Sequence, residues 1–467
     1  MKTLKLSLAS ALAVGAFGAL NAAPLEEAIK DIDVSGFGRY RYDANHYKFD
    51  ENFALGESKS NNNFHRFTLD VNFKATLDDN FFAFIGVRYD SRDISGAGNS
   101  DTHAYRGITN NRGGLSGMNA AYGNGWGGGG NSFAIRQYYV GFTGLPNTTI
   151  LAGRQPINSS FTDDSVGTGL KIVNNSIEGL TISAYAFDNI EDDEDLSPFD
   201  DYRSGTVLDP TYGIVLSDIM PGLDSMPYQN NLYGFAIKGA YDWFNFGAEV
   251  AHLQNVTTLW LVDLGANYAI NDDFSIRARA NVAGSHFTGK FKDRMSIYPS
   301  LLNYGEDGNV VKNSTLWGLT AGLSAYGFDF DAGYVQFGKK DMITIHSIED
   351  NGVLIKGGEL SFFYPRVAGK HKAWFVKAAY TYDAFSVGVD YVHDKVKNDI
   401  EADVKNQEWV IRAGYKYSDK LKLDAYYSMY TQKTEAKTYN LGYGDFVSTP
   451  SYKDRHNRLR IQATYSF

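Results

Sequence analysis

The last eleven residues of the chain, 457–467, alternate between polar and apolar side chains without a break. The apolar set ends the chain on an aromatic ring and consists of Leu459, Ile461, Ala463, Tyr465 and Phe467. The polar set between them consists of Arg458, Arg460, Gln462, Thr464 and Ser466. A period of two puts these sets on opposite faces of a β-strand. Strands of soluble sheets also alternate, but two arginines and a glutamine on one face are typical of a strand between water and lipid.

The same period recurs along the chain. Residues 39–43, 64–77 and 274–283 each place polar side chains on one face and apolar or aromatic side chains on the other. Together with similar segments they predict eighteen strands. These are residues 34–47, 64–77, 81–93, 133–143, 148–155, 170–174, 180–188, 230–242, 244–254, 258–269, 274–287, 314–326, 328–337, 372–382, 385–396, 407–417, 420–431 and 457–467.

The links between the predicted strands alternate between short and long. Short polar links such as 78–80, 271–273 and 383–384 are typical of turns between antiparallel strands. The long links are residues 48–63, 94–132, 156–169, 189–229, 288–313, 338–371 and 432–456. Bacterial outer-membrane barrels have short periplasmic turns and long external loops. The sequence therefore predicts an all-β, up-and-down antiparallel transmembrane β-barrel of eighteen strands, spanning residues 34–467, with both termini in the periplasm.

The N-terminus has the parts of an export signal. Lys2 and Lys5 precede an apolar stretch, residues 6–20, and Ala22 offers a small residue for cleavage. We expect residues 1–22 to be a signal peptide and residues 23–33 to form a short segment at the periplasmic mouth. Removal of two lysines with the signal lowers the formal charge from −10 to −12. This negative charge argues against nucleic acid as a partner, because phosphate binding requires a basic face.

Composition agrees with a barrel. The chain has no cysteine, so disulfides and thiolate metal sites are excluded. No segment after the signal holds eighteen consecutive apolar residues, so membrane-spanning helices are not expected. The 32 tyrosines and 30 phenylalanines favour strands and the aromatic girdles found at membrane surfaces.

Two stretches resemble a known family. Residues 23–43, APLEEAIKDIDVSGFGRYRYD, and residues 167–188, GTGLKIVNNSIEGLTISAYAFD, resemble the Campylobacter-type major outer-membrane porin family. Weaker similarity extends to 152–155, 415–428 and the C-terminal RLRIQATYSF. The resemblance implies an eighteen-stranded barrel, a homotrimer and a cation-preferring general-diffusion pore for ions and small hydrophilic solutes.

The resemblance has further implications for location and partners. It implies the outer membrane of a Gram-negative bacterium, with membrane lipids and lipopolysaccharide around the barrel. It also implies that the third long loop folds into the lumen as a constriction, with a calcium ion nearby. No other cofactor is expected.

The third long loop, residues 156–169, carries Asp163 and Asp164 at its tip. Paired carboxylates in a constriction raise the local concentration of cations and repel anions. They could also supply oxygen ligands for calcium, which takes six to eight of them. The alternative is a solvated loop with two ordinary aspartates.

Arginines are expected on the lumen wall opposite this loop. Parity along the strands assigns ten to the inner face: Arg39, Arg41, Arg66, Arg136, Arg154, Arg277, Arg279, Arg412, Arg458 and Arg460. An arginine facing lipid at mid-depth would cost roughly 2–4 kcal/mol, which supports the inward assignment. At the other face, the terminal Phe467 is the expected recognition signal for the barrel-assembly machinery.

The sequence favours a channel over an enzyme. It contains neither a Gly-x-Ser-x-Gly elbow nor a His-Glu-x-x-His motif, and its nine histidines are scattered. Two alternatives to a general-diffusion porin remain open. One is a substrate-selective channel with a binding ladder of arginines and aromatics, and the other is an adhesin that uses its long external loops.

Overall fold

The computed structural model describes twelve stretches of the chain. They are residues 32–49, 58–94, 130–162, 165–190, 207–209, 214–215, 230–289, 313–337, 358–360, 370–397, 402–442 and 445–467. The predicted signal peptide, residues 1–22, and residues 23–31 of the predicted periplasmic segment lie outside these stretches. Within them, no helix is long and apolar enough to cross a membrane.

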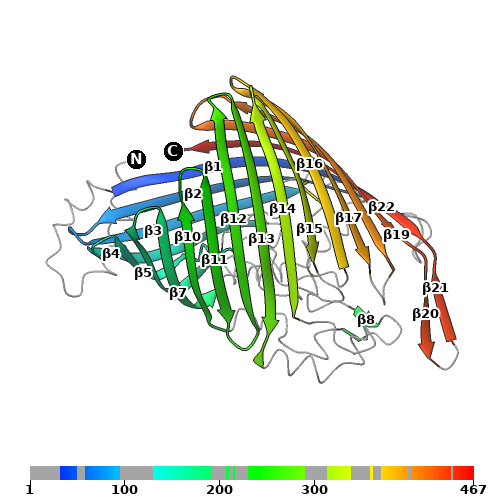
Figure 1. Ribbon diagram of the computed structural model, residues 1–467, viewed down its shortest axis with the longest axis horizontal. Helices are drawn as coiled ribbons and strands as arrows, with labels where there is room; N and C mark the ends of the chain where they lie inside the picture. The colour runs from blue at the N-terminus through cyan, green and yellow to red at the C-terminus, as the bar shows by residue number, and fades with distance from the viewer. Residues whose placement is uncertain are drawn as a thin grey trace.

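Eighteen antiparallel strands form one closed sheet (Figure 1). Each strand pairs with the next along the chain, and the first pairs with the last, so the sheet has no free edge. The first nine strands in order around the barrel are β1 (Ile32–Phe49), β2 (Ser58–Thr76), β3 (Phe81–Ile94), β4 (Gly130–Leu145), β5 (Thr148–Pro156), β6 (Val166–Ile177), β7 (Leu180–Ile190), β10 (Leu232–Ala240) and β11 (Phe244–Leu253). The other nine are β12 (Thr257–Asn271), β13 (Phe274–Phe287), β14 (Ser314–Ala325), β15 (Phe328–Phe337), β16 (Lys370–Tyr382), β17 (Phe385–Lys397), β18 (Val404–Lys416), β19 (Leu421–Thr434) and β22 (Tyr452–Ser466).

The structure confirms the predicted fold class and strand count. Every predicted strand has a counterpart, and the segments 274–287 and 328–337 agree at both ends. The largest differences are the second strand, predicted at 64–77 and observed as Ser58–Thr76, and the sixth strand, predicted at 170–174 and observed as Val166–Ile177. The ends of the sixth strand are rich in Gly, Ser and Asn, which give no apolar alternation, although their backbones pair with β5 and β7. β1 begins at Ile32, so the last two residues of the predicted periplasmic segment belong to the barrel.

Two short hairpins stand outside the closed sheet. β8 (Val207–Asp209) pairs with β9 (Ile214–Val215), and β20 (Lys437–Gly442) pairs with β21 (Asp445–Thr449). The second hairpin extends β19 and β22 beyond the rim of the barrel (Figure 1, lower right). Both hairpins lie in segments that were predicted as long loops, residues 189–229 and 432–456.

Tight turns gather at one end of the barrel. The links 146–147, 178–179, 326–327 and 383–384 are two residues long. Asn147 and Asp383 in these turns have φ values of 52° and 51°. This left-handed conformation is accessible to Asn and Asp, and such turns match the twist of paired strands.

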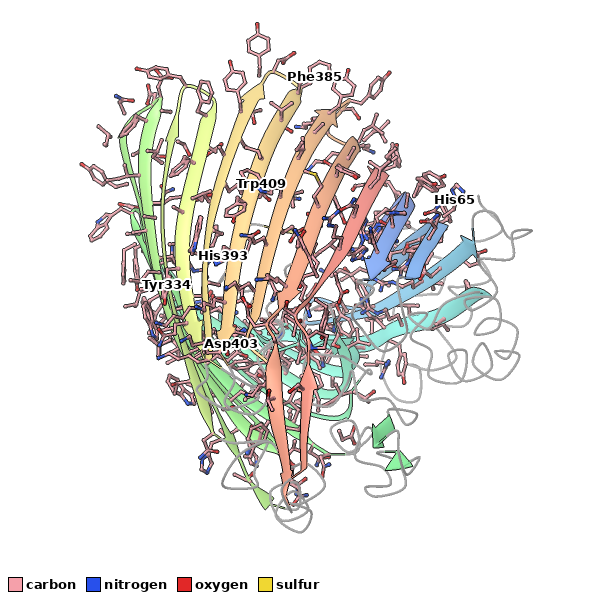
Figure 2. The ribbon with its side chains drawn as sticks, turned by 90° about the vertical axis from the view of Figure 1, so that its right-hand side faces the viewer. His65, Tyr334, Phe385, His393, Asp403 and Trp409 are labelled. Carbon is pink, nitrogen blue, oxygen red and sulfur yellow. The ribbon has the colours of Figure 1, made fainter. Side chains whose placement is uncertain are left out.

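Apolar side chains cover the outer face in a pattern typical of a membrane barrel. One band of exposed rings lies beside the tight turns and includes Trp243, Tyr326, Tyr382, Phe385 and Tyr417. A second band, further along the strands, is joined by ring contacts between Trp317 and Tyr334, Trp374 and Tyr391, and Tyr391 and Trp409. Figure 2 shows Phe385 at the strand end and Trp409 further along the wall. Two aromatic bands flanking apolar side chains mark the two surfaces of a bilayer.

The first and last strands meet at the seam where the barrel closes. β1 and β22 pair from Phe37 opposite Ser466 to Lys48 opposite Arg455. Beyond this register, Gly36 and Phe467 exchange two backbone hydrogen bonds of 3.0 Å. The phenyl ring of Phe467 is 40% exposed and stacks on Tyr465 at 6.4 Å. The last residue of the chain therefore completes the sheet.

Candidate functional site

The inner face of the barrel carries most of the predicted arginines. The described structure places Arg39, Arg41, Arg66, Arg277, Arg279, Arg412, Arg458 and Arg460 on this face. Their strand neighbours on the other face are exposed apolar residues, such as Tyr40, Ile276, Ile411 and Ile461. Arg88 on β3 belongs to the same face, and the sequence analysis did not select it.

Six of these arginines hold a carboxylate from a neighbouring strand. Arg66 binds Asp90 at 2.6 Å, and Arg88 binds Asp70 at 2.7 Å. Arg460 Nε donates to Asp43 at 2.6 Å, and Asp43 is only 1% exposed. The other three pairs are Arg279 with Asp263 at 2.6 Å, Arg277 with Asp331 at 2.7 Å and Arg412 with Asp390 at 2.5 Å. Charge on this part of the wall is therefore largely balanced in place.

Three arginines near the seam have neutral partners instead. Arg41 donates two hydrogen bonds to Gln462 Oε1, at 2.9 and 2.8 Å. Arg458 Nε donates to Asn45 Oδ1 at 2.8 Å, and the guanidinium of Arg39 lies 5.5 Å from the centre of the Phe37 ring. No carboxylate among the described residues lies within 4.0 Å of these three guanidinium groups. Among the described residues, these three arginines on β1 and β22 thus have no ion-pair partner of their own.

Arg136 and Arg154 occupy irregular positions. Arg136 is 8% exposed and lies at the register shift where β4 pairs with β3. The register sets Arg154 opposite Tyr138, which is 49% exposed on the outer face. Gly153 before it has a φ of 127°, which interrupts the regular extended backbone. The parity argument that assigned Arg154 to the lumen therefore does not hold at this residue.

The start of the third long loop is bound to the inner wall through Glu249 on β11. This buried carboxylate is 3% exposed and accepts the hydroxyls of Ser159 and Ser160, each at 2.6 Å. It also accepts the backbone N–H of Ser160 at 3.0 Å and the Tyr185 hydroxyl at 2.9 Å. Glu249 lies on the inner face, since its neighbour Val250 is 48% exposed outside. The loop therefore folds inward across β7 to reach β11.

Apolar side chains fill the space under this loop. Ile157, Phe161 and Val166 are all fully buried. Lys171 Nζ donates to the Ile157 carbonyl at 2.7 Å, and Ile157 N–H donates to the Ser165 carbonyl at 3.0 Å. Asp163 and Asp164, the predicted constriction residues, lie outside the described stretches. The residues on either side of this pair, Thr162 and Ser165, are both buried.

A second inward-folded segment comes from the link between β15 and β16. Residues 358–360 lie against the inner faces of β17 and β18. Glu408 on β18 accepts backbone N–H groups from Glu359 and Leu360, and Glu359 pairs with Arg412. Neither this segment nor the two anchoring glutamates, Glu249 and Glu408, were predicted from the sequence. The available signal was a lone glutamate on the inner face of an alternating strand, as at Glu249 and Glu408.

Metal-binding geometry is absent from the described part of the chain, where no three His, Asp or Glu residues cluster as a ligand set. The predicted calcium ligands fall on Asp163 and Asp164, outside that part. Beside them, the buried Thr162 Oγ1 has no hydrogen-bond partner among the described residues.

Comparison with known proteins settles the family. The sequence pattern of the Campylobacter major outer membrane protein family matches residues 1–465. The chain belongs to this family. As a family member with a closed eighteen-stranded barrel, it resides in the outer membrane of a Gram-negative bacterium and forms a porin channel. No protein of curated function matches the chain.

Several solved structures have a similar fold. Pseudomonas aeruginosa OpdK, solved with vanillate, superimposes with a TM-score of 0.56 at 11% identity over 93% of this family member and 99% of OpdK. P. aeruginosa OccK2 (OpdF), solved with glucuronate, superimposes with a TM-score of 0.57 at 11% identity; the match covers 93% of this chain and 98% of OccK2. Acinetobacter baumannii OccAB4 superimposes with a TM-score of 0.55 at 12% identity; the match covers 92% of this chain and 98% of OccAB4. At these identities the likeness shows a shared barrel fold.

Proposed function

We propose that this porin forms a water-filled channel for passive diffusion of ions and small hydrophilic solutes. The observation that carries the proposal is the separation of faces: charged pairs such as Arg460–Asp43 line the inside, and lipid-compatible side chains cover the outside. The purified protein should produce stable ohmic steps in a planar bilayer. Absence of conductance from correctly folded protein would contradict the proposal.

We propose that the channel prefers cations through Asp163 and Asp164. The support is the anchoring of the loop: Ser159 and Ser160 before the pair are bound to Glu249 inside the barrel. Carboxylates held in a narrow wet passage attract cations more strongly than in bulk water. Asp163→Asn combined with Asp164→Asn should weaken the cation preference. An unchanged reversal potential in a salt gradient would refute this role.

We propose that the same aspartates bind calcium. Their carboxylates and the neighbouring Thr162 hydroxyl oxygen suit a hard cation, which prefers oxygen ligands. A bound calcium ion would supply a local positive charge at the loop and hold its tip. A chelator should therefore increase the rate of proteolysis at the loop in the wild type and leave the double Asn variant unchanged. Equal rates with and without chelator would exclude a calcium site.

We propose that the native form is a homotrimer in contact with lipopolysaccharide, exported by the signal at residues 1–22. Cross-linking of the native membrane should give a ladder of bands that ends at the trimer.

We propose that the barrel-assembly machinery recognises Phe467. This residue is exposed on the outer side of the seam, where the machinery can bind it before the barrel closes. Phe467→Ser should slow membrane insertion in cells, while the purified chain should still fold in detergent.

A substrate-selective channel for oxyanions is the second candidate. The observation that favours it is that Arg39, Arg41 and Arg458 have no ion-pair partner among the described residues. Guanidinium groups bind carboxylate and phosphate through paired hydrogen bonds. A selective site would give a saturable block of potassium current by benzoate or inorganic phosphate. Arg39→Gln with Arg41→Gln should abolish the saturation, whereas Arg279→Gln, an arginine paired with Asp263, should retain it.

A further inference from the structure

Residues 358–360 reach deep into the barrel from its external side. The link that contains them joins β15 and β16 at the end opposite the tight turn 326–327. Their partner Arg412 lies only four residues from the other end of β18, Lys416. The contact therefore sits in the half of the wall nearer the tight turns. Residues 358–360 therefore lie inside the lumen, well away from the end of the wall at which their link begins and ends.

Glu408 holds the backbone of this segment. Its carboxylate is fully buried and accepts the N–H of Glu359 at 2.8 Å and that of Leu360 at 2.9 and 3.0 Å. Ser428 on β19 donates its hydroxyl to the same carboxylate at 2.5 Å. Hydrogen bonds to an ionised acceptor are stronger than neutral ones. The Glu408 carboxylate thus accepts hydrogen bonds from two backbone N–H groups that have no neighbouring strand to pair with.

Arg412 and Asp390 fix the other end of the segment. Arg412 Nη2 donates to the Gly358 carbonyl at 3.0 Å, and Gly358 N–H donates to Asp390 at 3.3 Å. Gly358 has a φ of 91°, a conformation that favours glycine. Arg412 Nη1 also pairs with the carboxylate of Glu359. The segment is therefore clamped at three consecutive residues.

The Glu359 side chain remains 22% exposed while its backbone is fixed. It pairs with Arg412, which Asp390 also binds, and its negative charge acts on Arg460 and Tyr426, which lie beside Arg412 across β19 and β22. Leu360, in contrast, is 7% exposed against the wall. Of these two side chains, only that of Glu359 keeps partial access to the lumen.

We propose that residues 358–360 form a second constriction element, separate from the third long loop, and that Glu359 is a determinant of ion selectivity. Glu408 and Arg412 are positioning residues that keep this carboxylate in the pore. The inference rests on the proposed function, because selectivity needs a conducting channel. Its placement inside the lumen can be tested without any current.

The first experiment uses thiol labelling, since the chain has no cysteine of its own. Glu359→Cys should react with a small methanethiosulfonate reagent but slowly with a polymer-linked maleimide. Ser448→Cys, exposed on the external hairpin β20–β21, should react with both. Adding Glu408→Gln should speed the bulky reaction at position 359. Equal polymer labelling at both cysteines would overturn the proposal, whether or not the protein conducts.

The second experiment measures reversal potential and conductance in planar bilayers. Glu359→Gln should shift the reversal potential towards anion permeation with less than about a twofold change in conductance. Adding Arg412→Gln should restore the reversal potential, because the double variant has the same net charge as the wild type at this point of the wall, where Asp390 also binds Arg412. Glu435→Gln serves as the matched control. Glu435 lies in the link after β19, and this change also removes a carboxylate that pairs with basic side chains, those of Lys405 and Lys433. A shift no larger than that of the control would refute Glu359 as a selectivity determinant.

Discussion

Asp43 and Arg460 show how individual residues set the electrostatics of this pore. The carboxylate of Asp43 is nearly inaccessible, and it receives two hydrogen bonds from Arg460, at 2.6 and 3.1 Å. The guanidinium also lies 5.4 Å from the centre of the Tyr426 ring. Because the pair is partly buried, loss of one partner leaves an uncompensated charge, which costs more than loss of both.

Asp43→Asn should therefore destabilise the barrel and make the pore more anion-permeable. We expect a loss of roughly 1–3 kcal/mol, the cost of a charged hydrogen bond in a partly buried site. The freed charge of Arg460 adds to those of Arg39, Arg41 and Arg458, which have no ion-pair partner among the described residues. Denaturant titration in detergent and reversal potentials would measure the two effects. The double change Asp43→Asn with Arg460→Gln should recover both the stability and the reversal potential. If it recovered neither, Asp43 and Arg460 would not act as an ion pair.

Sequence parity predicted the face of most arginines because a regular strand alternates strictly. It could not predict their partners, since Asp43 and Arg460 are 417 residues apart and meet only through closure of the barrel. Parity also failed at Arg154, where Gly153 changes the backbone, and gave no account of the register shift at Arg136. The inward segment 358–360 has no periodic signal because it is held by side chains of the wall.

At the scale of elements, the seam between β1, β2 and β22 depends on close backbone approach at Gly36. A Cβ at this position would lie 2.0 Å from the Asp70 carbonyl oxygen on β2 and 3.1 Å from the Phe467 ring. A backbone oxygen cannot move aside as a flexible side chain can. Gly38, two residues along the same strand, has its nearest neighbour at 3.9 Å, the Leu69 side chain.

Gly36→Ala should weaken closure of the barrel, whereas Gly38→Ala should fold normally. The overlap at Gly36 must separate β1 from β2 and disturb the hydrogen bonds with Phe467. Heat-modifiable gel mobility reports closed barrels, and the Gly36 variant should lose its folded band at a lower temperature. Indistinguishable melting of the two variants would show that the seam accommodates a methyl group.

The third long loop depends on Glu249 in a similar way. Tyr185→Phe removes one hydroxyl from the buried set around this carboxylate, and we expect a local cost of about 1 kcal/mol. Glu249→Gln removes the charged acceptor of Ser159 and Ser160 and should release the loop. Proteolysis within the loop should therefore rise slightly in the first variant and strongly in the second. The reverse order would contradict anchoring by Glu249.

At the scale of the whole molecule, alternation and link length were sufficient to predict the barrel. Each strand has one face towards water and one towards lipid, so polar and apolar side chains alternate along its sequence. Tight turns at one end and long links at the other then determine the antiparallel order. The hairpins β8–β9 and β20–β21 escaped prediction because they do not separate lipid from water, and so lack the contrast between faces that marks the wall strands.

The division between lipid and water can be tested within one strand, β17. Val389 is 39% exposed on the outer face, between Phe385 at the strand end and the ring contact of Tyr391 with Trp409. Ser386 lies on the inner face, opposite Gly414.

A lysine facing lipid near mid-depth costs roughly 2–4 kcal/mol, while a lysine facing the lumen stays hydrated. Val389→Lys should therefore lower the unfolding free energy in lipid vesicles by that amount, and Ser386→Lys should change it little. Equal losses would mean that both residues face the same medium, which a closed barrel in a bilayer does not allow.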